Sequence, residues 1–231
     1  MTELPFRLDL EPPFLIVRFE NTQRTLGWSI TMPGFASARE VVWLEVRDDD
    51  LAIHIDPVDF VGAKLLSRGL TDAAAFMTSR EIQRHHIAQS RIGVATATCL
   101  TTVGLSNGEK VGKRHRQETS AVGTVNTLVH VSRPLSAGAF VESVSIATQA
   151  RTAAIMETND LRDGPAITGT GTDCILIMAP EGDAPETCAG LHTDLGEAIG
   201  AAVYDATHAG ATEWSAELKL ANGIQSLWTT P

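Results

Sequence analysis

The second half of this 231-residue chain alternates between strand-like and helix-like sequence patterns. Residues 123–132 are rich in Val and Thr, and Ser136 then caps a helix whose apolar residues recur three and four positions apart. A Gly-Pro pair at 164–165 breaks this helix, an apolar strand follows over 174–180, and a last helix begins at Thr193. A strand, a helix and a second strand in this order predict a parallel crossover in one sheet.

The first fifth of the chain is made of strand candidates, which indicates antiparallel pairing there. These candidates cover 14–19, 24–30 and 40–46, and a loop of small residues over 33–38 separates the last two. Two short helices are expected to follow, at 56–66 and 79–89.

Together these patterns predict an α/β (α+β mixed) fold. The expected architecture is a mixed β-sheet with antiparallel N-terminal strands and helices packed on it, in a single domain over residues 1–231. We expect the last helix to end near His208 and Gly210, because both are typical of helix C-termini. A less regular C-terminal tail is predicted from about residue 211.

The composition argues against two classes of partner. The net charge of −10 disfavours nucleic acid, because phosphates require clustered Lys and Arg. No apolar run approaches the roughly 18 residues of a membrane span, and the first residues lack the layout of a signal peptide. The cysteines Cys99, Cys174 and Cys188 share no metal-ligand spacing, and the first two read as buried thiols. We therefore expect a cytoplasmic protein with no metal site.

Residues 167–173 read Ile-Thr-Gly-Thr-Gly-Thr-Asp and form the strongest candidate for a ligand site. Threonine favours extended backbone, and the interleaved glycines let a ligand approach that backbone closely. Asp173 then stands alone where the polar segment meets the apolar strand. We interpret Asp173 as a candidate catalytic residue, and the alternative is an ordinary carboxylate bonded to turn amides.

Two other polar turns lie beside apolar strands. The segment Gly-Thr-Val-Asn at 123–126 opens a strand, and the Asn126 amide can donate and accept, which suits polarisation of a carbonyl. Residues 104–108 match the G-x-S-x-G pattern of serine hydrolases, but a charged stretch follows where that motif requires a helix. We therefore interpret the turn at Ser106 as pocket lining, with a nucleophilic serine as the alternative.

Histidines supply one more candidate. His192 precedes the last helix, whose positive N-terminal end favours a neutral imidazole that can act as a base. The alternative is an ordinary loop histidine. His85 and His86 are adjacent in a predicted helix and would point about 100° apart, so we expect exposed side chains rather than a shared metal ion.

Taken in order, these segments resemble the adenosylcobinamide amidohydrolases, the CbiZ family. The motifs that carry the resemblance lie at 77–79, 102–107, 123–126, 147–153, 168–173 and 190–200. The resemblance spans roughly residues 24–209, although family members often carry a run of glycines where this chain has 32–37.

This resemblance implies hydrolysis of the amide that joins aminopropanol to the corrin ring, giving adenosylcobyric acid for cobamide salvage. The corrinoid is then a small-molecule substrate and no cofactor is expected; the chain lacks the Asp-x-His-x-x-Gly segment of cobalt-ligating histidines. On this hypothesis Asp173 and His192 transfer protons. The residues expected to bind the substrate are Ser106, Asn107, Thr124, Asn126, Thr168, Thr170 and Thr172.

Three other functions stay open at this point. The first is a non-catalytic corrinoid-binding protein of the same fold, and the second is an amidohydrolase that acts on a different amide. The third is a serine esterase that uses Ser106. The sequence also leaves a homo-oligomer open.

Overall fold

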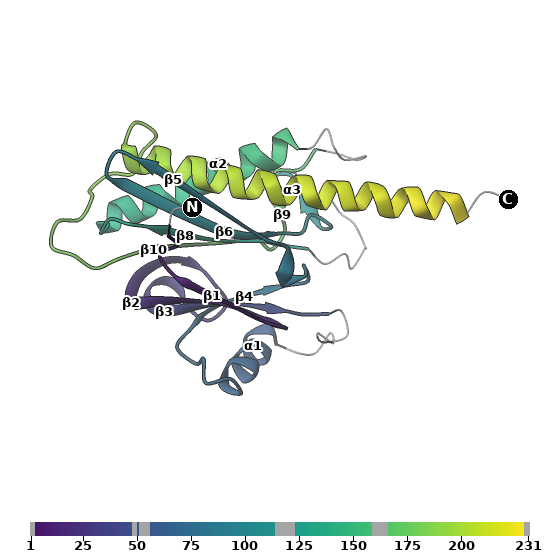
Figure 1. Cartoon of the computed structure of the whole chain (residues 1–231), viewed down its shortest axis with the longest axis horizontal. Coiled ribbons are helices and arrows are strands. Elements are labelled where there is room, and N and C mark those ends of the chain that lie inside the picture. The colour runs from purple at the N-terminus through teal and green to yellow at the C-terminus, as the bar shows by residue number, and fades with distance from the viewer. Residues whose placement is uncertain (1–2, 48–49, 51–55, 114–122, 159–165, 229–231) are drawn as a thin grey trace.

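The computed structural model describes residues 3–47, 50, 56–113, 123–158 and 166–228, with side chains described as far as residue 221. An eight-stranded sheet bends so that its two halves face each other, and helices cover both outer faces (Figure 1). The result is four layers, in which two helices, two sheet halves and one helix follow one another.

The strand order explains how the sheet is divided. The strands are β1 (Arg7–Glu11), β2 (Phe14–Trp28), β3 (Pro33–Glu45), β4 (Ala74–Thr78), β5 (His85–Ile92), β6 (Ala95–Val103), β8 (Val125–Val131) and β10 (Cys174–Ala179). They are ordered β4-β3-β2-β10-β8-β6-β5, with β1 also paired to β2. The pairs β8–β10 and β3–β4 are parallel and the other pairs are antiparallel. The predicted mixed sheet is therefore confirmed.

The remaining elements connect or cover these strands. They are the helices α1 (Pro57–Leu66), α2 (Ala137–Glu157) and α3 (Asp194–Trp228), the 3-10 helix η2 (Ile82–Arg84), and the small pair β7 (Gly108–Glu109) and β9 (Gly169–Thr170). Asp56 and Ser136 cap α1 and α2 through their side chains. The cap at Ser136 and the start of the first helix at residue 56 agree with the sequence prediction. The chain passes from β8 through α2 to its parallel neighbour β10, which confirms the predicted crossover.

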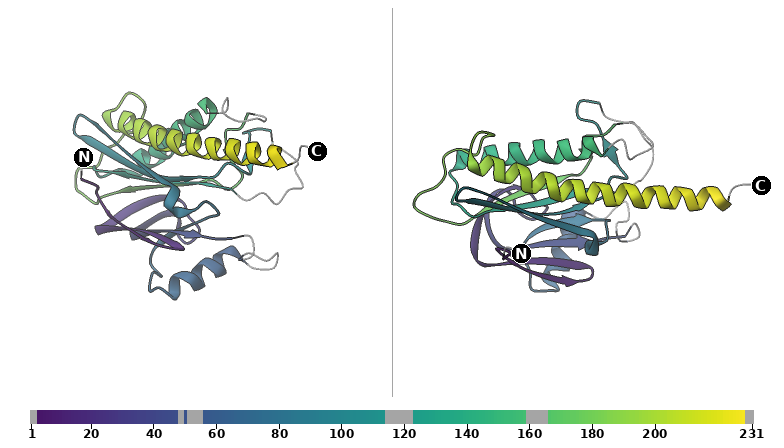
Figure 2. Two further views of the ribbon diagram at one scale, coloured as in Figure 1. Left: turned by 45° about the vertical axis from the view of Figure 1, so that its right-hand side comes forward. Right: turned by 45° about the horizontal axis from the view of Figure 1, so that its top comes forward.

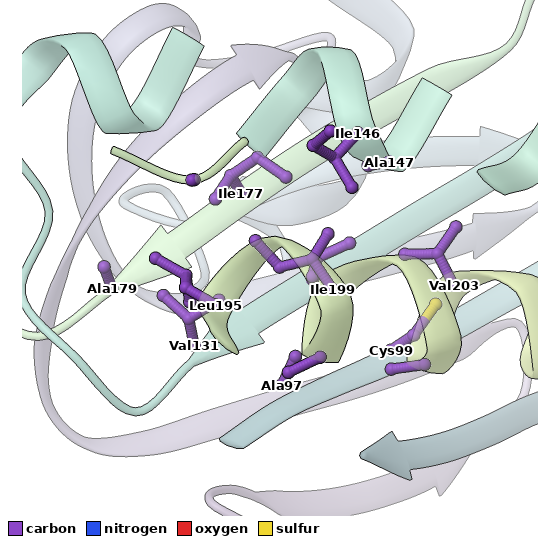
Figure 3. Packing of buried hydrophobic residues seen from close by; sticks show 14 of the residues in the cluster. Ala97, Cys99, Val131, Ile146, Ala147, Ile177, Ala179, Leu195, Ile199 and Val203 are labelled. Atoms are coloured by element: carbon purple, nitrogen blue, oxygen red, sulfur yellow. The ribbon is translucent and has the colours of Figure 1, made fainter. Parts of the chain in front are cut away.

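Four apolar clusters of described residues fill the spaces between the layers, and the smallest lies where α2 and α3 meet β6 and β8. One cluster joins α2 and α3 to β6, β8 and β10, and Leu195, Ile199 and Val203 of α3 point into it (Figure 3). A second lies between the two halves of the sheet, and a third joins α1 to β2, β3 and β4. Figure 2 shows α1 and the α2–α3 pair on opposite sides of the sheet.

The C-terminal helix is longer than the sequence suggests. The expected stop at His208 and Gly210, and the irregular tail from about 211, are both wrong, because α3 continues to Trp228. Gly210 serves close packing instead, since a Cβ there would lie 2.7 Å from Val103 Cγ2 on β6. Beyond it, Ala211 and Trp214 bury against the sheet at helical spacing, which keeps the helix folded.

Two other local predictions are wrong for reasons of tertiary packing. Residues 79–89 do not form a helix; they contain η2 and most of β5, which pairs in full register with β6 and lies against α3. Residues 33–38 are the first part of β3 rather than a loop, and they pair with the last part of β2. In both segments strand pairing overrides weak local preferences.

His130 gives the fold a dependence on pH. Its imidazole on β8 is 8% exposed and lies 5.1 Å from the Phe19 ring, and burial lowers its pKa to about 4. Below pH 6.5 His130 is protonated in the unfolded chain, whereas in the folded chain it becomes protonated only near pH 4. We therefore expect the free energy of unfolding to fall by about 3 kcal/mol between these pH values because of this residue.

The measurement is urea unfolding of the wild type and of His130→Phe at pH 7 and pH 4.5. His130→Phe should lose much of the stability difference between the two pH values, whereas the exposed His192→Phe should retain it. An unchanged pH dependence in His130→Phe would show that other groups cause it.

Candidate functional site

A cavity of about 360 Å³ opens at one end of the layer between the two sheet halves. It lies where β8 and β10 begin and where β4 ends, so segments that are distant in the sequence meet there. Its lining consists of Ile30, Val46, Pro57, Met77, Thr78, Ser79, Asn107, Gly123, Thr124, Thr172 and Cys174. The predicted binding residues Asn107, Thr124 and Thr172 are therefore brought together.

Hydrogen bonds hold the segments of this cavity in place. The Thr124 hydroxyl donates to the main-chain oxygen of Thr172 at 2.8 Å, and the Thr172 hydroxyl donates to that of Gly123 at 3.1 Å. Asn126 is buried behind them and donates from Nδ2 to the Met77 carbonyl at 2.8 Å. Asn126 thus joins β8 to β4 across the two sheet halves, which makes it a positioning residue for the cavity.

The turn that carries Asn107 lies against the start of β8. A Cβ at Gly123 would be 2.9 Å from the main-chain nitrogen of Ser106 and 3.3 Å from that of Asn107, so only glycine permits this approach. Asn107 is half-buried in the cavity wall, and its buried Oδ1 has no hydrogen-bond partner. The Ser106 side chain is exposed and does not line the cavity.

Asp173 lies between the lining residues Thr172 and Cys174, but its side chain contacts β8, the turn before β10 and α2 instead of the cavity. Its Oδ1 accepts hydrogen bonds from Val125 N at 3.2 Å and from the Thr170 hydroxyl at 2.5 Å, and Oδ2 accepts one from Thr170 N at 3.0 Å. Arg151 Nη1 on α2 lies 3.1 Å from Oδ2, and both side chains are about nine-tenths buried. The carboxylate is therefore surrounded by donors, which suits a residue that positions the turn around it.

A second cavity of about 250 Å³ adjoins the first on the α2 side. Asp173 and the predicted binding residues Thr168 and Thr170 line it, together with Arg151. The Thr168 hydroxyl accepts a hydrogen bond from Val111 N at 2.8 Å. The segment from Thr168 to Cys174 is thus a shared wall between two cavities, and the predicted threonines are divided between them.

His192 lies at the other end of the sheet. It is exposed and follows the end of β10, whereas Asp173 precedes the start of that strand. The helix that follows it begins beside the β5–β6 turn, since a Cβ at Gly93 would be 2.1 Å from Asp194 Oδ2. Leu195 packs with Val131 and Ala179 at this end (Figure 3). The structure therefore separates the two residues expected to transfer protons.

Sequence reasoning missed two polar groups of the cavity. The sequence predicts that Ser79 begins a helix, but it follows the end of β4 and lines the cavity. Cys174 reads in the sequence as a buried thiol, and it is in fact half-buried in the cavity wall. Burial and the Asp173 carboxylate raise the pKa of this thiol to about 11, so it is protonated near neutral pH. The resemblance at 77–79 is the signal that could have identified Ser79.

The adjacent histidines are on β5 rather than on a helix. His85 Nδ1 contacts the Ile82 carbonyl at 2.8 Å, and His86 Nε2 contacts Glu213 Oε2 at 2.8 Å. Within the described residues, no three His, Cys, Asp or Glu side chains are grouped as metal ligands. None of the helices in that part of the chain combines the length and hydrophobicity that a bilayer span needs.

Comparisons with known proteins found similar solved structures, two of which are described first. One solved structure is the PH0078 protein from Pyrococcus horikoshii OT3, with 11% identity, a TM-score of 0.43, and coverage of 85% of this chain and 76% of that one. Another is a Burkholderia sp. beta-aminopeptidase, with 9% identity, a TM-score of 0.44, and coverage of 87% and 78%. Among curated proteins there is no significant match.

The family comparison is decisive because it covers nearly the whole chain. The sequence model described as adenosylcobinamide amidohydrolase, CbiZ, matches residues 3–219. This range includes every segment that lines the cavity between the sheet halves. The chain is therefore a hydrolase of an amide bond, and it belongs to the adenosylcobinamide amidohydrolase (CbiZ) family.

Proposed function

We propose that this protein hydrolyses the amide between aminopropanol and the corrin ring of adenosylcobinamide, giving adenosylcobyric acid and free aminopropanol. The corrinoid is the substrate, and no separate cofactor is part of the proposal. The observation that carries it is the meeting of residues 77–79, 107, 123–124 and 172–174 around one cavity. Each belongs to or adjoins one of the six motifs that resemble the family, and these segments come together although they lie far apart in the sequence.

The polar groups of the cavity suit an amide substrate. Asn107 lines the cavity with an amide whose Oδ1 is buried without a partner. Its Nδ2 is the group that can donate a hydrogen bond to the carbonyl oxygen of a substrate amide. Thr124 and Thr172 form the wall beside this turn. Thr124 donates to the main-chain oxygen of Thr172 and Thr172 to that of Gly123, so the wall keeps a fixed position next to Asn107.

The reaction places defined demands on this cavity. Water adds to the amide carbonyl carbon, charge develops on the carbonyl oxygen, the C–N bond breaks, and the departing amine takes a proton. We assign binding of the substrate amide to Asn107. Asp173 positions Thr172, because its carboxylate accepts hydrogen bonds from Val125 N and Thr170 N and so fixes the turn that carries Thr172. Of the described residues that line the cavity, Cys174 is the only titratable one, and it is a thiol at neutral pH. Proton transfer by Asp173 or His192 stays a prediction.

The test is incubation of the purified protein with adenosylcobinamide, followed by chromatography for aminopropanol and for adenosylcobyric acid. We expect both products in equal amounts, at a rate proportional to the protein concentration. Quantitative recovery of adenosylcobinamide would overturn the proposal. If a simple amide is cleaved while adenosylcobinamide is not, the enzyme acts on another amide. Binding without cleavage would identify a corrinoid-binding protein.

A further inference from the structure

The cavity is small compared with the proposed substrate. Its volume of about 360 Å³ is near the lower end of the range of roughly 300–1,000 Å³ that holds drug-sized ligands. A corrin macrocycle with its amide arms and adenosyl group is much larger than such a ligand. The cavity therefore has room for the aminopropanol arm and its amide, and the macrocycle has to rest on the surface around the mouth.

An exposed tryptophan is hydrogen-bonded to a residue that stands between two residues of the cavity lining. Trp28, the last residue of β2, is 42% exposed, so part of a large apolar ring is open to a ligand. Its indole Nε1 donates to the main-chain oxygen of Asp173 at 2.5 Å, and Asp173 stands between the lining residues Thr172 and Cys174. Ile30, two residues after Trp28, lines the cavity as well.

The placement of this ring is fixed before any ligand arrives. The carbonyl that holds the indole belongs to Asp173, whose side chain is itself held by Thr170, Val125 and Arg151. A rigid aromatic ring loses little conformational entropy on binding, so its exposed face is suited to packing against the ring of a large ligand. A second exposed apolar residue, Val58, follows Pro57 of the cavity lining.

We propose that Trp28 is a specificity-determining residue, on whose exposed ring the macrocycle of the corrinoid packs while the aminopropanol arm occupies the cavity. This inference rests on the proposed function and extends it from the bond that is cleaved to the part of the substrate that is recognised. It assigns binding of the macrocycle to the surface, and binding of the amide to Asn107. The contribution of the macrocycle to binding can therefore be separated from that of the amide by comparing the full substrate with a small amide that lacks the ring.

The experiment compares adenosylcobinamide with N-(2-hydroxypropyl)propanamide, which carries the arm without the ring. In Trp28→Ala we expect KM for adenosylcobinamide to rise about tenfold with little change in kcat, the size of effect that one lost stacking contact produces. The kcat/KM of the small amide, or its Ki as an inhibitor, should not change. Trp28→Phe keeps an aromatic face but cannot donate to Asp173, and should bind adenosylcobinamide more tightly than Trp28→Ala.

Phe35→Ala is the matched control. It removes an exposed aromatic ring that contacts Phe140 on α2, and it should leave both substrates unaffected. An unchanged KM in Trp28→Ala would overturn the inference, and so would an equal loss for both substrates, since that would indicate damage to the cavity wall. If the wild type binds adenosylcobinamide without cleaving it, the proposed function fails. The inference is then decided by whether Trp28→Ala weakens that binding in a titration.

Discussion

Asp173→Asn is expected to lose turnover and to lower the free energy of unfolding by about 3–5 kcal/mol, because it breaks a buried ion pair. The substitution leaves the Arg151 guanidinium buried without its carboxylate partner. It also replaces one carboxylate oxygen by an NH₂ group, which cannot accept the hydrogen bond that Val125 N or Thr170 N now donates. The wall between the two cavities, including Thr172, should therefore lose its fixed position.

The measurements are chemical denaturation and the rate of aminopropanol release. Asp183→Asn is the control, since it makes the same change at an exposed loop position and should alter neither quantity by a measurable amount. The double variant Arg151→Met with Asp173→Asn should recover part of the stability, because no buried charge is left unpaired. Equal stability of Asp173→Asn and the wild type would show that the ion pair does not hold this wall.

Asn107→Ala is expected to lower kcat/KM by about 10²–10³-fold, the usual effect of removing one group that stabilises a polar transition state. The change should leave stability unaltered or slightly higher, because the unpaired buried Oδ1 is removed as well. Loss of activity without loss of stability distinguishes a substrate contact from a structural role. The measurement is steady-state hydrolysis of adenosylcobinamide beside denaturation of the same preparation.

Asn21→Ala is the matched control for this experiment. It removes the same amide from an exposed position on β2 and should leave both activity and stability unchanged. Wild-type kcat/KM in Asn107→Ala would remove this residue from the substrate-binding set. A fall in activity that follows a fall in stability would assign it to the fold instead.

The parts of the fold that could be predicted are those in which the local pattern and the tertiary contacts agree. The start of α1 is specified by the cap at Asp56. The crossover through α2 is specified by the cap at Ser136 and by the apolar run of β10. The end of α3 could not be predicted, because Gly210 is a stop signal only if nothing packs against it. In the structure β6 lies so close to this residue that a side chain would not fit.

The site was predicted in part for a topological reason. Thr124 and Thr172 each precede one of two parallel neighbouring strands, and the starts of such strands lie at the same edge of a sheet. His192 follows β10 instead, so the same topology places it at the opposite edge. Ser79 was missed because β4 joins this edge only when the sheet bends back on itself, and the bend depends on long-range packing.

The most direct test of the account uses Cys174, which lines the cavity as a protonated thiol. Hydrolysis of adenosylcobinamide should be measured for Cys174→Ala and Cys174→Phe, with the folding of each checked by denaturation. Alanine should keep kcat/KM within about threefold of the wild type, since a protonated thiol is not the nucleophile. Phenylalanine should obstruct the cavity and stop the release of aminopropanol. A folded Cys174→Phe enzyme with the wild-type rate would place amide cleavage elsewhere on the molecule.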